Sequence, residues 1–446
     1  MNTATFALIT KLRGHLQGGG LKAQLLRGGI GSIAVKIAHT GLAFLLAVLL
    51  ARTLGPEGYG IYSFAFALVS LMAVPSQLGL PELMVRETAK AQAHEQWGLL
   101  RGLWRWSSLT VWGFSSLIAL AALTGIWLFG DGMGNAQRQT LLVSLLLIPL
   151  VALGNLRGAA LKGLRRVVLG QLPESVLRPA ILIGLTSAIW LLVGSITPMS
   201  AMGLHAIAAA VAFIIGAFLL WRARPQSLGA SPTPQFQSRQ WLSSALPLAM
   251  IAGLQLINNQ TDIIMLGIFR SPEEVGVYKV VVASAAFVTF GLQAVNAVVS
   301  PYFAKYYIEG DMMRFQTIVK LSTRASLVMG LPVASIFLLL GDQLLGVVFG
   351  EEYVAGYNAL MIIIIGQVVN VCVGLVGTIL VMTGNEKSSL FALVVSSLVN
   401  VSLNVLLIPF YGIQGAAIAS VMTIMLWNFF MWHMVKKKLN IQTGFL

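Results

Sequence analysis

Apolar stretches long enough to cross a lipid bilayer recur along this chain, and they limit its possible folds more than any other feature. A hydrocarbon core about 30 Å thick needs about 20 helical residues to span it. Of the 446 residues, 57% are apolar and only 10% are charged, and the mean hydropathy is +0.83. Soluble proteins of this length do not have such a composition. The chain is therefore expected to be an all-α polytopic membrane protein.

Twelve such stretches predict twelve transmembrane helices. Their ranges are 30–51, 58–80, 107–129, 140–160, 176–194, 200–221, 242–268, 276–299, 323–341, 358–382, 388–409 and 413–435. They form two six-helix bundles, 30–221 and 242–435, joined by a cytoplasmic linker, 222–241, whose Pro, Ser and Gln content is typical of a flexible segment. A cytoplasmic or interfacial segment, 1–29, precedes the bundles, and a basic cytoplasmic tail, 436–446, follows them.

The positive charges predict the orientation of the chain. With the N-terminus in the cytoplasm, 23 of the 29 Lys and Arg residues lie on the cytoplasmic side. The other six are Arg52, Arg138, Arg270 and Lys279 on the opposite side and Lys36 and Arg157 within spans. Because cytoplasmic loops of membrane proteins are enriched in Lys and Arg, both termini are expected to be cytoplasmic. The net charge of +14 is then topogenic, and no basic soluble domain remains to bind nucleic acid.

A seven-residue pattern, P-E-x-x-G-[IV]-Y, occurs twice in the chain, 216 residues apart. The first copy, 56–62, follows span one, and the second, 272–278, follows span seven. Because each half has six spans, the two halves enter the membrane in the same direction. The pattern therefore predicts a parallel internal repeat.

The residues around these two copies are expected to form exposed turns. Gly55, Gly58 and Gly60 are predicted to permit a tight reversal between spans one and two. Arg52 and Arg270 flank the two turns and are expected to be solvated.

The stretch at 51–90, ARTLGPEGYGIYSFAFALVSLMAVPSQLGLPELMVRETAK, closely resembles the opening signature of the polysaccharide-unit flippases, the Wzx-type O-antigen family. Further matches are DIIMLG at 262–267 and YGIQGAA at 411–417. That family belongs to the multidrug/oligosaccharidyl-lipid/polysaccharide exporter superfamily. The resemblance covers essentially the whole chain.

The resemblance implies a carrier in a bacterial inner membrane. It would move an undecaprenyl-diphosphate-linked oligosaccharide, such as an O-antigen unit for lipopolysaccharide, from the inner to the outer leaflet. The implied partners are this glycan, membrane lipids, and polysaccharide polymerase and chain-length proteins. Alternating access of the two halves is the expected mechanism, driven by the membrane potential or by H⁺ or Na⁺ as coupling ion.

A polar stripe on span seven is predicted to face the bundle interior or a watery cavity. Gln255, Asn258, Asn259 and Asp262 recur at helical spacing and so share one face, which lipid cannot satisfy. Other amides follow on later spans: Gln293 and Asn296, Gln367 and Asn370, Asn400 and Asn404. Amides offer donors and acceptors to sugar hydroxyls. Alternatively, they hydrogen-bond neighbouring helices together.

Charged groups within spans are the other candidates for the substrate path. Lys36, with His39 on the same face, and Arg157 could offset the diphosphate charge, or could extend to the cytoplasmic surface. His39 and His205 are expected to pack or hydrogen-bond. Asp262 is expected either to partner a donor on a neighbouring helix or to hold a coupling cation.

Several function classes are excluded or disfavoured by what the sequence lacks. It has no G-x-x-x-x-G-K-[ST] pattern and no Cys/His cluster with metal spacing, so no nucleotide, cofactor, metal or catalytic residue is predicted. A membrane enzyme that joins glycans would need a large outer loop, and none is present. The remaining alternative is a cation-coupled antiporter of small molecules or drugs with the same superfamily fold.

Overall fold

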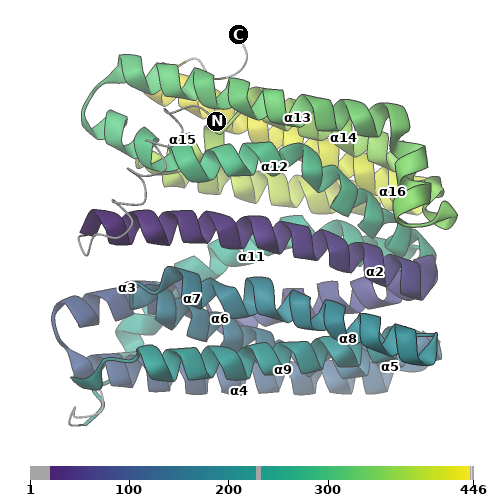
Figure 1. Ribbon diagram of the computed structural model, residues 1–446, viewed down its shortest axis with the longest axis horizontal. Helices are drawn as coiled ribbons and strands as arrows, with labels where there is room; N and C mark the ends of the chain where they lie inside the picture. The colour runs from purple at the N-terminus through teal and green to yellow at the C-terminus, as the bar shows by residue number, and fades with distance from the viewer. Residues whose placement is uncertain (1–20, 228–232, 442, 444–446) are drawn as a thin grey trace, which may run out of the picture.

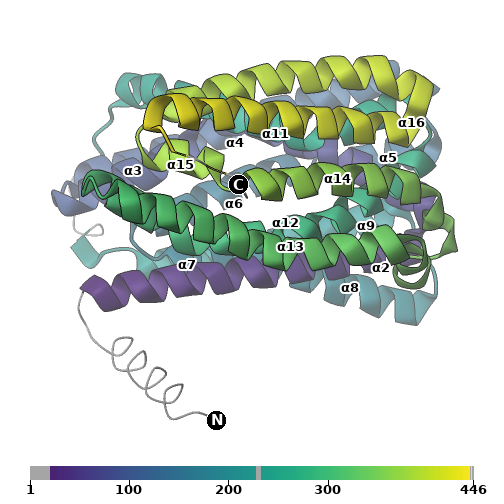
Figure 2. The same ribbon diagram turned by 90° about the horizontal axis from the view of Figure 1, so that it is seen from above.

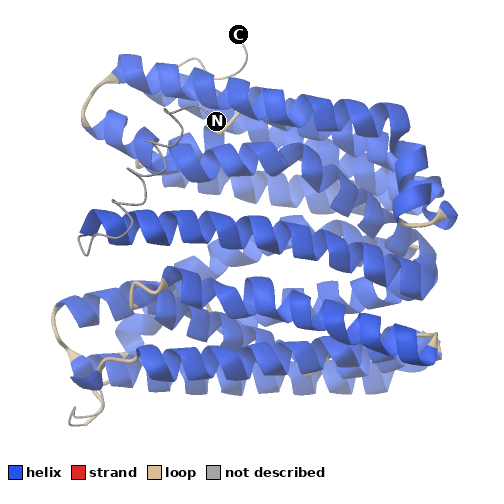
Figure 3. Cartoon of the chain, viewed as in Figure 1, coloured by secondary structure: helices blue, strands red, loops and turns tan. Residues whose placement is uncertain are grey.

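The computed structural model describes residues 21–227, 233–441 and 443, and these residues form helices and connecting turns without a strand (Figure 3). The elements are α2 (Leu21–Gln77), α3 (Leu80–Ala93), α4 (Trp97–Phe129), η1 (Gly130–Gly132), α5 (Asn135–Ser144), α6 (Leu147–Gly163), α7 (Val167–Leu172), η2 (Pro173–Leu177), α8 (Arg178–Val193), α9 (Pro198–Ala223), α11 (Ser238–Phe269), α12 (Pro272–Ile308), α13 (Met312–Val348), η3 (Glu351–Gly356), α14 (Tyr357–Val373), α15 (Val376–Met382) and α16 (Glu386–Leu439). The predicted all-α class is confirmed.

Within the described residues, ten helices are long and apolar enough to cross a membrane. Two of them, α2 and α16, each contain one residue with non-helical backbone angles, Gly55 and Gly412. The chain reverses at Gly412, because Asn400 Nδ2 lies 3.3 Å from Thr423 Oγ1, whereas 23 residues of straight helix would be roughly 34 Å long. Eight of the twelve predicted ranges lie within a single described helix, whereas 58–80, 140–160, 176–194 and 358–382 extend across the end of one.

The helices lie roughly parallel, in two groups (Figures 1 and 2). The first group holds α2 to α9, and the second holds α12 to α16. The turns within α2 and α16 lie at the same end of the molecule, which we call the turn end. The linker joins α9 to α11 at the opposite end, which we call the linker end.

Helix α11 contacts both groups. At its start, Trp241 and Ala245 are buried against the first group, and the Trp241 ring lies 5.4 Å from the Trp106 ring. Near its end, Asp262 hydrogen-bonds residues of α12 and α16. Helix α11 therefore begins in contact with the first group, although it belongs to the part of the chain after the linker.

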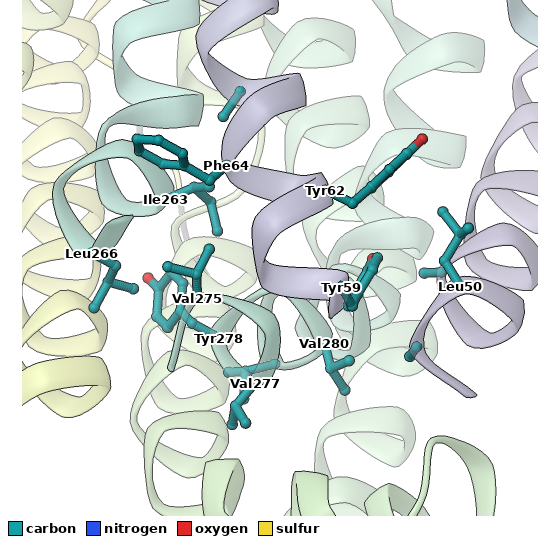
Figure 4. Close-up of a cluster of buried hydrophobic side chains, with 14 of the residues drawn as sticks. Leu50, Tyr59, Tyr62, Phe64, Ile263, Leu266, Val275, Val277, Tyr278 and Val280 are labelled. Atoms are coloured by element: carbon teal, nitrogen blue, oxygen red, sulfur yellow. The ribbon is translucent and has the colours of Figure 1, made fainter. Parts of the chain in front are cut away.

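The two copies of the repeated pattern pack against each other where α2 meets α12. A Cβ on Gly60 would collide with the carbonyl oxygen of Pro272, and a Cβ on Gly276 would collide with the carbonyl oxygen of Pro56. We call these four residues the glycine seam. Figure 4 shows the adjoining core, which includes Tyr59 of α2 and Val280 of α12. Gly60 therefore serves helix packing, and the prediction that it forms part of the turn is wrong. Only Gly55, with φ 68°, has the turn conformation there.

Both arginines that were expected to be solvated bind backbone carbonyl groups at the turn end. Arg52 Nε donates to Val348 O at 2.8 Å, and its Nη2 donates to Val347 O. Arg270 Nε donates to Ile408 O at 3.1 Å. The Arg52 contacts join α2 to α13, so they tie the two groups together beside the seam. Arg52 is exposed and Arg270 is partly exposed, so both side chains make these contacts while remaining accessible to solvent.

The predicted flanking segments are only partly described. Residues 1–20 of the 1–29 segment and residues 228–232 of the linker lie outside the described residues, and from Leu21 the chain already belongs to α2. Beyond that gap, the linker backbone contacts α4, since Gln235 N donates to Gly98 O at 3.0 Å. The basic tail begins as the last turn of α16, where Lys438 Nζ donates to Asn385 Oδ1 at 3.2 Å.

Candidate functional site

A cavity of about 380 Å³ lies between the two groups of helices, beside the glycine seam. Its wall comes from both parts of α2, from η2, α8 and α9, and from α12. His39 and Phe66 both line it, although they are 27 residues apart within α2. The reversal at Gly55 is therefore what folds α2 around the cavity.

Two strong cations face this central cavity, Arg178 from α8 and Lys279 from α12. Arg178 pairs with Glu174, the one carboxylate among the described residues of the wall, and Arg178 Nη1 lies 2.9 Å from Glu174 Oε2. Lys279 has no hydrogen-bond or ion-pair partner among the described residues. With Glu174 ionised and the histidines neutral, the wall carries one positive charge in excess. Such a wall attracts an anion.

Sequence reasoning missed both cations. Arg178 was counted with the cytoplasmic charges and Lys279 with the outer ones, but both lie in the cavity wall. One signal could have identified Lys279, because it directly follows the second copy of the repeated pattern and so lies inside the start of α12.

Aromatic and polar groups line the rest of the cavity. Tyr62 Oη lies 2.7 Å from His205 Nδ1, and both side chains are buried. The rings of Tyr59 and Tyr62 are stacked, with their centroids 6.4 Å apart. Tyr59 and Tyr62 project toward the same side of α2 in Figure 4. Gln293 contributes an amide from α12. Rings and amides of this kind can pack against and hydrogen-bond a sugar.

A second, apolar cavity of about 270 Å³ adjoins the central one. Phe44 and Phe287 line both cavities, and their ring centroids are 4.6 Å apart in an edge-to-face arrangement. The remaining wall is almost wholly apolar and comes from α12 and α13 and from Phe349. The charged space and the apolar space therefore share this pair of rings in their walls.

Lys36 lies in a third cavity, of about 430 Å³, nearer the linker end. Lys162 and Gln171 also line it. His39 lines both this cavity and the central one, and its Nδ1 lies 3.0 Å from Ser175 O. Lys36 is thus not in the wall of the central cavity. His39, which lines both cavities, connects the two.

Arg157 is separated from the central cavity. Its Nη1 donates to Phe213 O at 2.9 Å, and its guanidinium lies 3.2 Å from the centre of the Phe213 ring. Arg157 instead lines a small pocket between α6 and α9 that Glu174 also borders. Arg157 therefore does not face the central cavity.

Asp262 is the centre of a buried polar cluster formed by α11, α12 and α16. Its Oδ2 accepts from Tyr278 Oη at 2.9 Å and from Ser420 Oγ, and its Oδ1 accepts from Asn404 Nδ2 at 2.8 Å. Asn400 Nδ2 lies 3.5 Å from the same Oδ1. The amide oxygens of Asn400 and Asn404 are buried without a hydrogen-bond partner among the described residues. Both roles predicted for Asp262, structural partner and cation ligand, are compatible with this geometry.

The polar stripe on span seven does not act as one surface. Gln255 and Asn259 are exposed, whereas Asn258 is half-buried and its Oδ1 has no hydrogen-bond partner among the described residues. None of the three hydrogen-bonds Asp262. Of the other amides, Asn296 accepts from Ser300 within α12 at 2.9 Å, and Asn370 accepts from Asn428 between α14 and α16 at 2.9 Å. The contact between Asn370 and Asn428 joins two helices, which is the alternative role predicted for these amides.

Comparisons with known proteins agree with one another. Residues 25–307 match the family described as polysaccharide biosynthesis protein, and residues 247–406 match the family described as MatE. A probable low-salt glycan biosynthesis flippase of Haloferax volcanii, Agl15, is 24% identical over 405 residues, which are 90% of this chain and 81% of that protein.

Solved structures with the same fold are transporters and flippases. An inward-facing multidrug resistance MATE transporter of the MOP superfamily superposes with a TM-score of 0.74 at 13% identity, over 92% of this chain and 98% of that one. The lipid II flippase MurJ, in an inward closed conformation, superposes with a TM-score of 0.71 at 16% identity, over 91% and 87%. Because the polysaccharide biosynthesis match covers more than half of the residues, the chain belongs to that family.

Proposed function

We propose that this protein is a flippase that moves an undecaprenyl-diphosphate-linked oligosaccharide from the cytoplasmic to the outer leaflet of a bacterial inner membrane. The observation that carries the proposal is Lys279, which has no hydrogen-bond or ion-pair partner among the described residues and faces the same cavity as Arg178. A cation without a partner is costly inside a membrane protein unless an anion comes to it. The glycan flippase from Haloferax volcanii and the lipid II flippase fold support the same substrate class.

The central cavity matches two parts of such a substrate, its diphosphate and its sugars. A diphosphate would bind Arg178 and Lys279 through charge-assisted hydrogen bonds. Sugars would contact the tyrosines and Gln293, and Lys36 and His39 would line the approach from the linker end. The membrane potential favours the outward movement of an anion by ~2.3 kcal/mol per charge per 100 mV.

For the topology we propose twelve spans with both termini in the cytoplasm. Counting the helices before and after Gly55 and Gly412 separately adds two spans to the ten apolar helices. The halves 30–221 and 242–435 then form a parallel repeat, and the turn end faces outward. The glycine seam and the Arg52 contacts close the turn end. We propose that these contacts separate when the halves rock and the cavity opens outward.

The flippase and the alternative antiporter differ in what their loss would do. Deleting the protein is expected to remove surface polysaccharide and to leave resistance to cationic dyes unchanged, because the cavity carries excess positive charge. Its one carboxylate among the described wall residues is already paired with Arg178. Glycan staining after electrophoresis and dye-sensitivity plates measure the two effects. Increased dye sensitivity with intact glycan would favour the antiporter.

Asp262 is the proposed site of a coupling cation. Asn400 Oδ1 and Asn404 Oδ1 lie beside this carboxylate and have no hydrogen-bond partner within the described ranges, so the cluster offers oxygen ligands for Na⁺ or a site for H⁺. In inside-out vesicles, Asp262→Asn is expected to remove the stimulation of glycan translocation by an imposed Na⁺ or H⁺ gradient. Stimulation of the variant equal to that of the wild type would assign Asp262 to helix packing alone.

Lys36 is expected to contribute to translocation less than the cavity cations do. Lys36→Gln should lower surface glycan several-fold, and Lys36→Arg should retain most of it, because Lys36 lines only the approach. Glycan yield is to be compared at equal protein abundance on immunoblots. Full glycan from the Lys36→Gln strain would mean that the side chain only extends to the membrane surface.

A further inference from the structure

Glu174 lies in an unusual backbone segment. Residues Pro173–Leu177 form a π-helical turn between α7 and α8. Such turns are rare and occur frequently at functional sites. The turn places the Glu174 carboxylate against α6, where a Cβ on Gly154 would collide with Glu174 Oε1. A glycine on one helix and a π turn on the next together make room for this acid.

The ion pair of Glu174 with Arg178 is close but poorly aligned. The side chains are 16% and 19% exposed, and Nη1 lies 2.9 Å from Oε2. No hydrogen bond to Oε2 with acceptable geometry comes from any described residue. A carboxylate that is buried without aligned donors is held less firmly than one in a bidentate pair.

Within the part of the chain that the structure describes, Arg178 is the one residue that forms an ion pair with Glu174. Arg157 borders a pocket shared with Glu174, but Phe213 already engages its guanidinium. Lys162 and Glu82 line a further cavity, of about 400 Å³, which Glu174 also borders on its linker-end side. Glu174 therefore touches both this space and the central cavity, where Arg178 and Lys279 lie.

We propose that Glu174 is an internal counter-ion that the phosphate of the substrate displaces from Arg178, and that returns to Arg178 when the substrate leaves. This inference rests on the proposed function, and it makes Glu174 a positioning residue. In the empty carrier the acid holds the guanidinium at the cavity wall. During release it competes with the departing phosphate, and so it limits rebinding. Removing its charge should strengthen anion binding and slow turnover.

The test uses purified full-length protein, with inorganic pyrophosphate as the binding probe in calorimetry and lipid-linked oligosaccharide in reconstituted vesicles for turnover. Glu174→Gln is expected to bind pyrophosphate at least threefold more tightly and to translocate at least threefold more slowly. Glu174→Asp should behave nearly as the wild type. Glu82→Gln is the matched control, because Glu82 shares the cavity of about 400 Å³ with Glu174 but does not line the central one. Neither pyrophosphate binding nor turnover should change in this variant. If Glu174→Gln does not fold, Glu174→Ala removes the same charge.

Variants of Arg178 distinguish this inference from the proposed function on which it rests. Arg178→Gln should weaken pyrophosphate binding at least tenfold, and adding Glu174→Gln to it should restore nothing. Unchanged or weaker binding by Glu174→Gln, together with an Arg178-dependent wild type, would overturn the counter-ion role alone. Tighter binding that persists without Arg178 would also overturn it. Pyrophosphate binding that does not depend on Arg178 in the wild type would overturn the diphosphate site and the inference together.

Discussion

Replacing Lys279 with glutamine is expected to reduce glycan export more than tenfold at unchanged protein abundance. Lys279 faces the central cavity without a partner among the described residues. Its loss would remove a charge-assisted contact of about 1.5–3 kcal/mol, and each 1.4 kcal/mol corresponds to about a tenfold change. Lys279→Arg should keep most export, because the charge remains. Export is to be measured as surface glycan normalised to the immunoblot signal.

A control for Lys279 exists on the same helix. Lys305 of α12 is exposed and lies 3.8 Å from Glu309, so Lys305→Gln removes an equal charge away from the cavity. It should cost little, since exposed ion pairs contribute roughly 0–1 kcal/mol. Equal export by the two glutamine variants would remove Lys279 from the substrate path.

The second large effect is expected at the glycine seam. Gly60→Ala would place a Cβ against the carbonyl oxygen of Pro272, and Gly276→Ala would place one against that of Pro56. Either change should force α2 and α12 apart and abolish export. In a Cys372→Ser background, a cysteine at Ser63, which lines the central cavity, should react faster with an impermeant thiol reagent added outside. The comparison is the same cysteine with the seam intact.

Three further variants control the seam experiment. Gly41→Ala lies on α2 with nothing within 4 Å of the added Cβ, and it should preserve export because alanine favours the helix. Gly134 and Ser227 are both exposed. If the turn end faces outward, a cysteine at Gly134 should be labelled by the reagent added outside, and a cysteine at Ser227 should not. Unchanged labelling of the Ser63 cysteine and unchanged export in Gly60→Ala would show that the seam does not close the cavity.

The helical spans could be predicted from sequence because a bilayer imposes a minimum length of apolar chain, and length is visible in a single sequence. The role of Gly60 in helix packing could not be predicted from sequence. A glycine in a turn and a glycine under a crossing helix look alike until the partner is known, and the partner here lies 212 residues away at Pro272. Recognising the repeated pattern did identify both sides of the seam, but not that they touch.

The cavity residues were harder to predict, because sequence position indicates depth in the membrane but not the neighbour that a side chain meets. His39 and Gln293 were selected and do line the central cavity. Arg178 lies near the start of a span, where a topogenic role was the simpler interpretation. Asp262 shares a helical face with Gln255 and Asn259. However, α11 passes from one group of helices to the other, so its successive turns meet different surroundings.

The course of α11 has a mechanical consequence. Its first turns are anchored by Trp241 in the first group, and its last turns are anchored through Asp262 in the second. Any rotation of one group relative to the other must therefore bend the helix between these anchors. Pro247 lies in that interval and already removes one backbone hydrogen bond. An ion or proton that strengthens the contacts of Asp262 would stiffen the end of α11 that lies in the second group, while Trp241 fixes its other end near the linker.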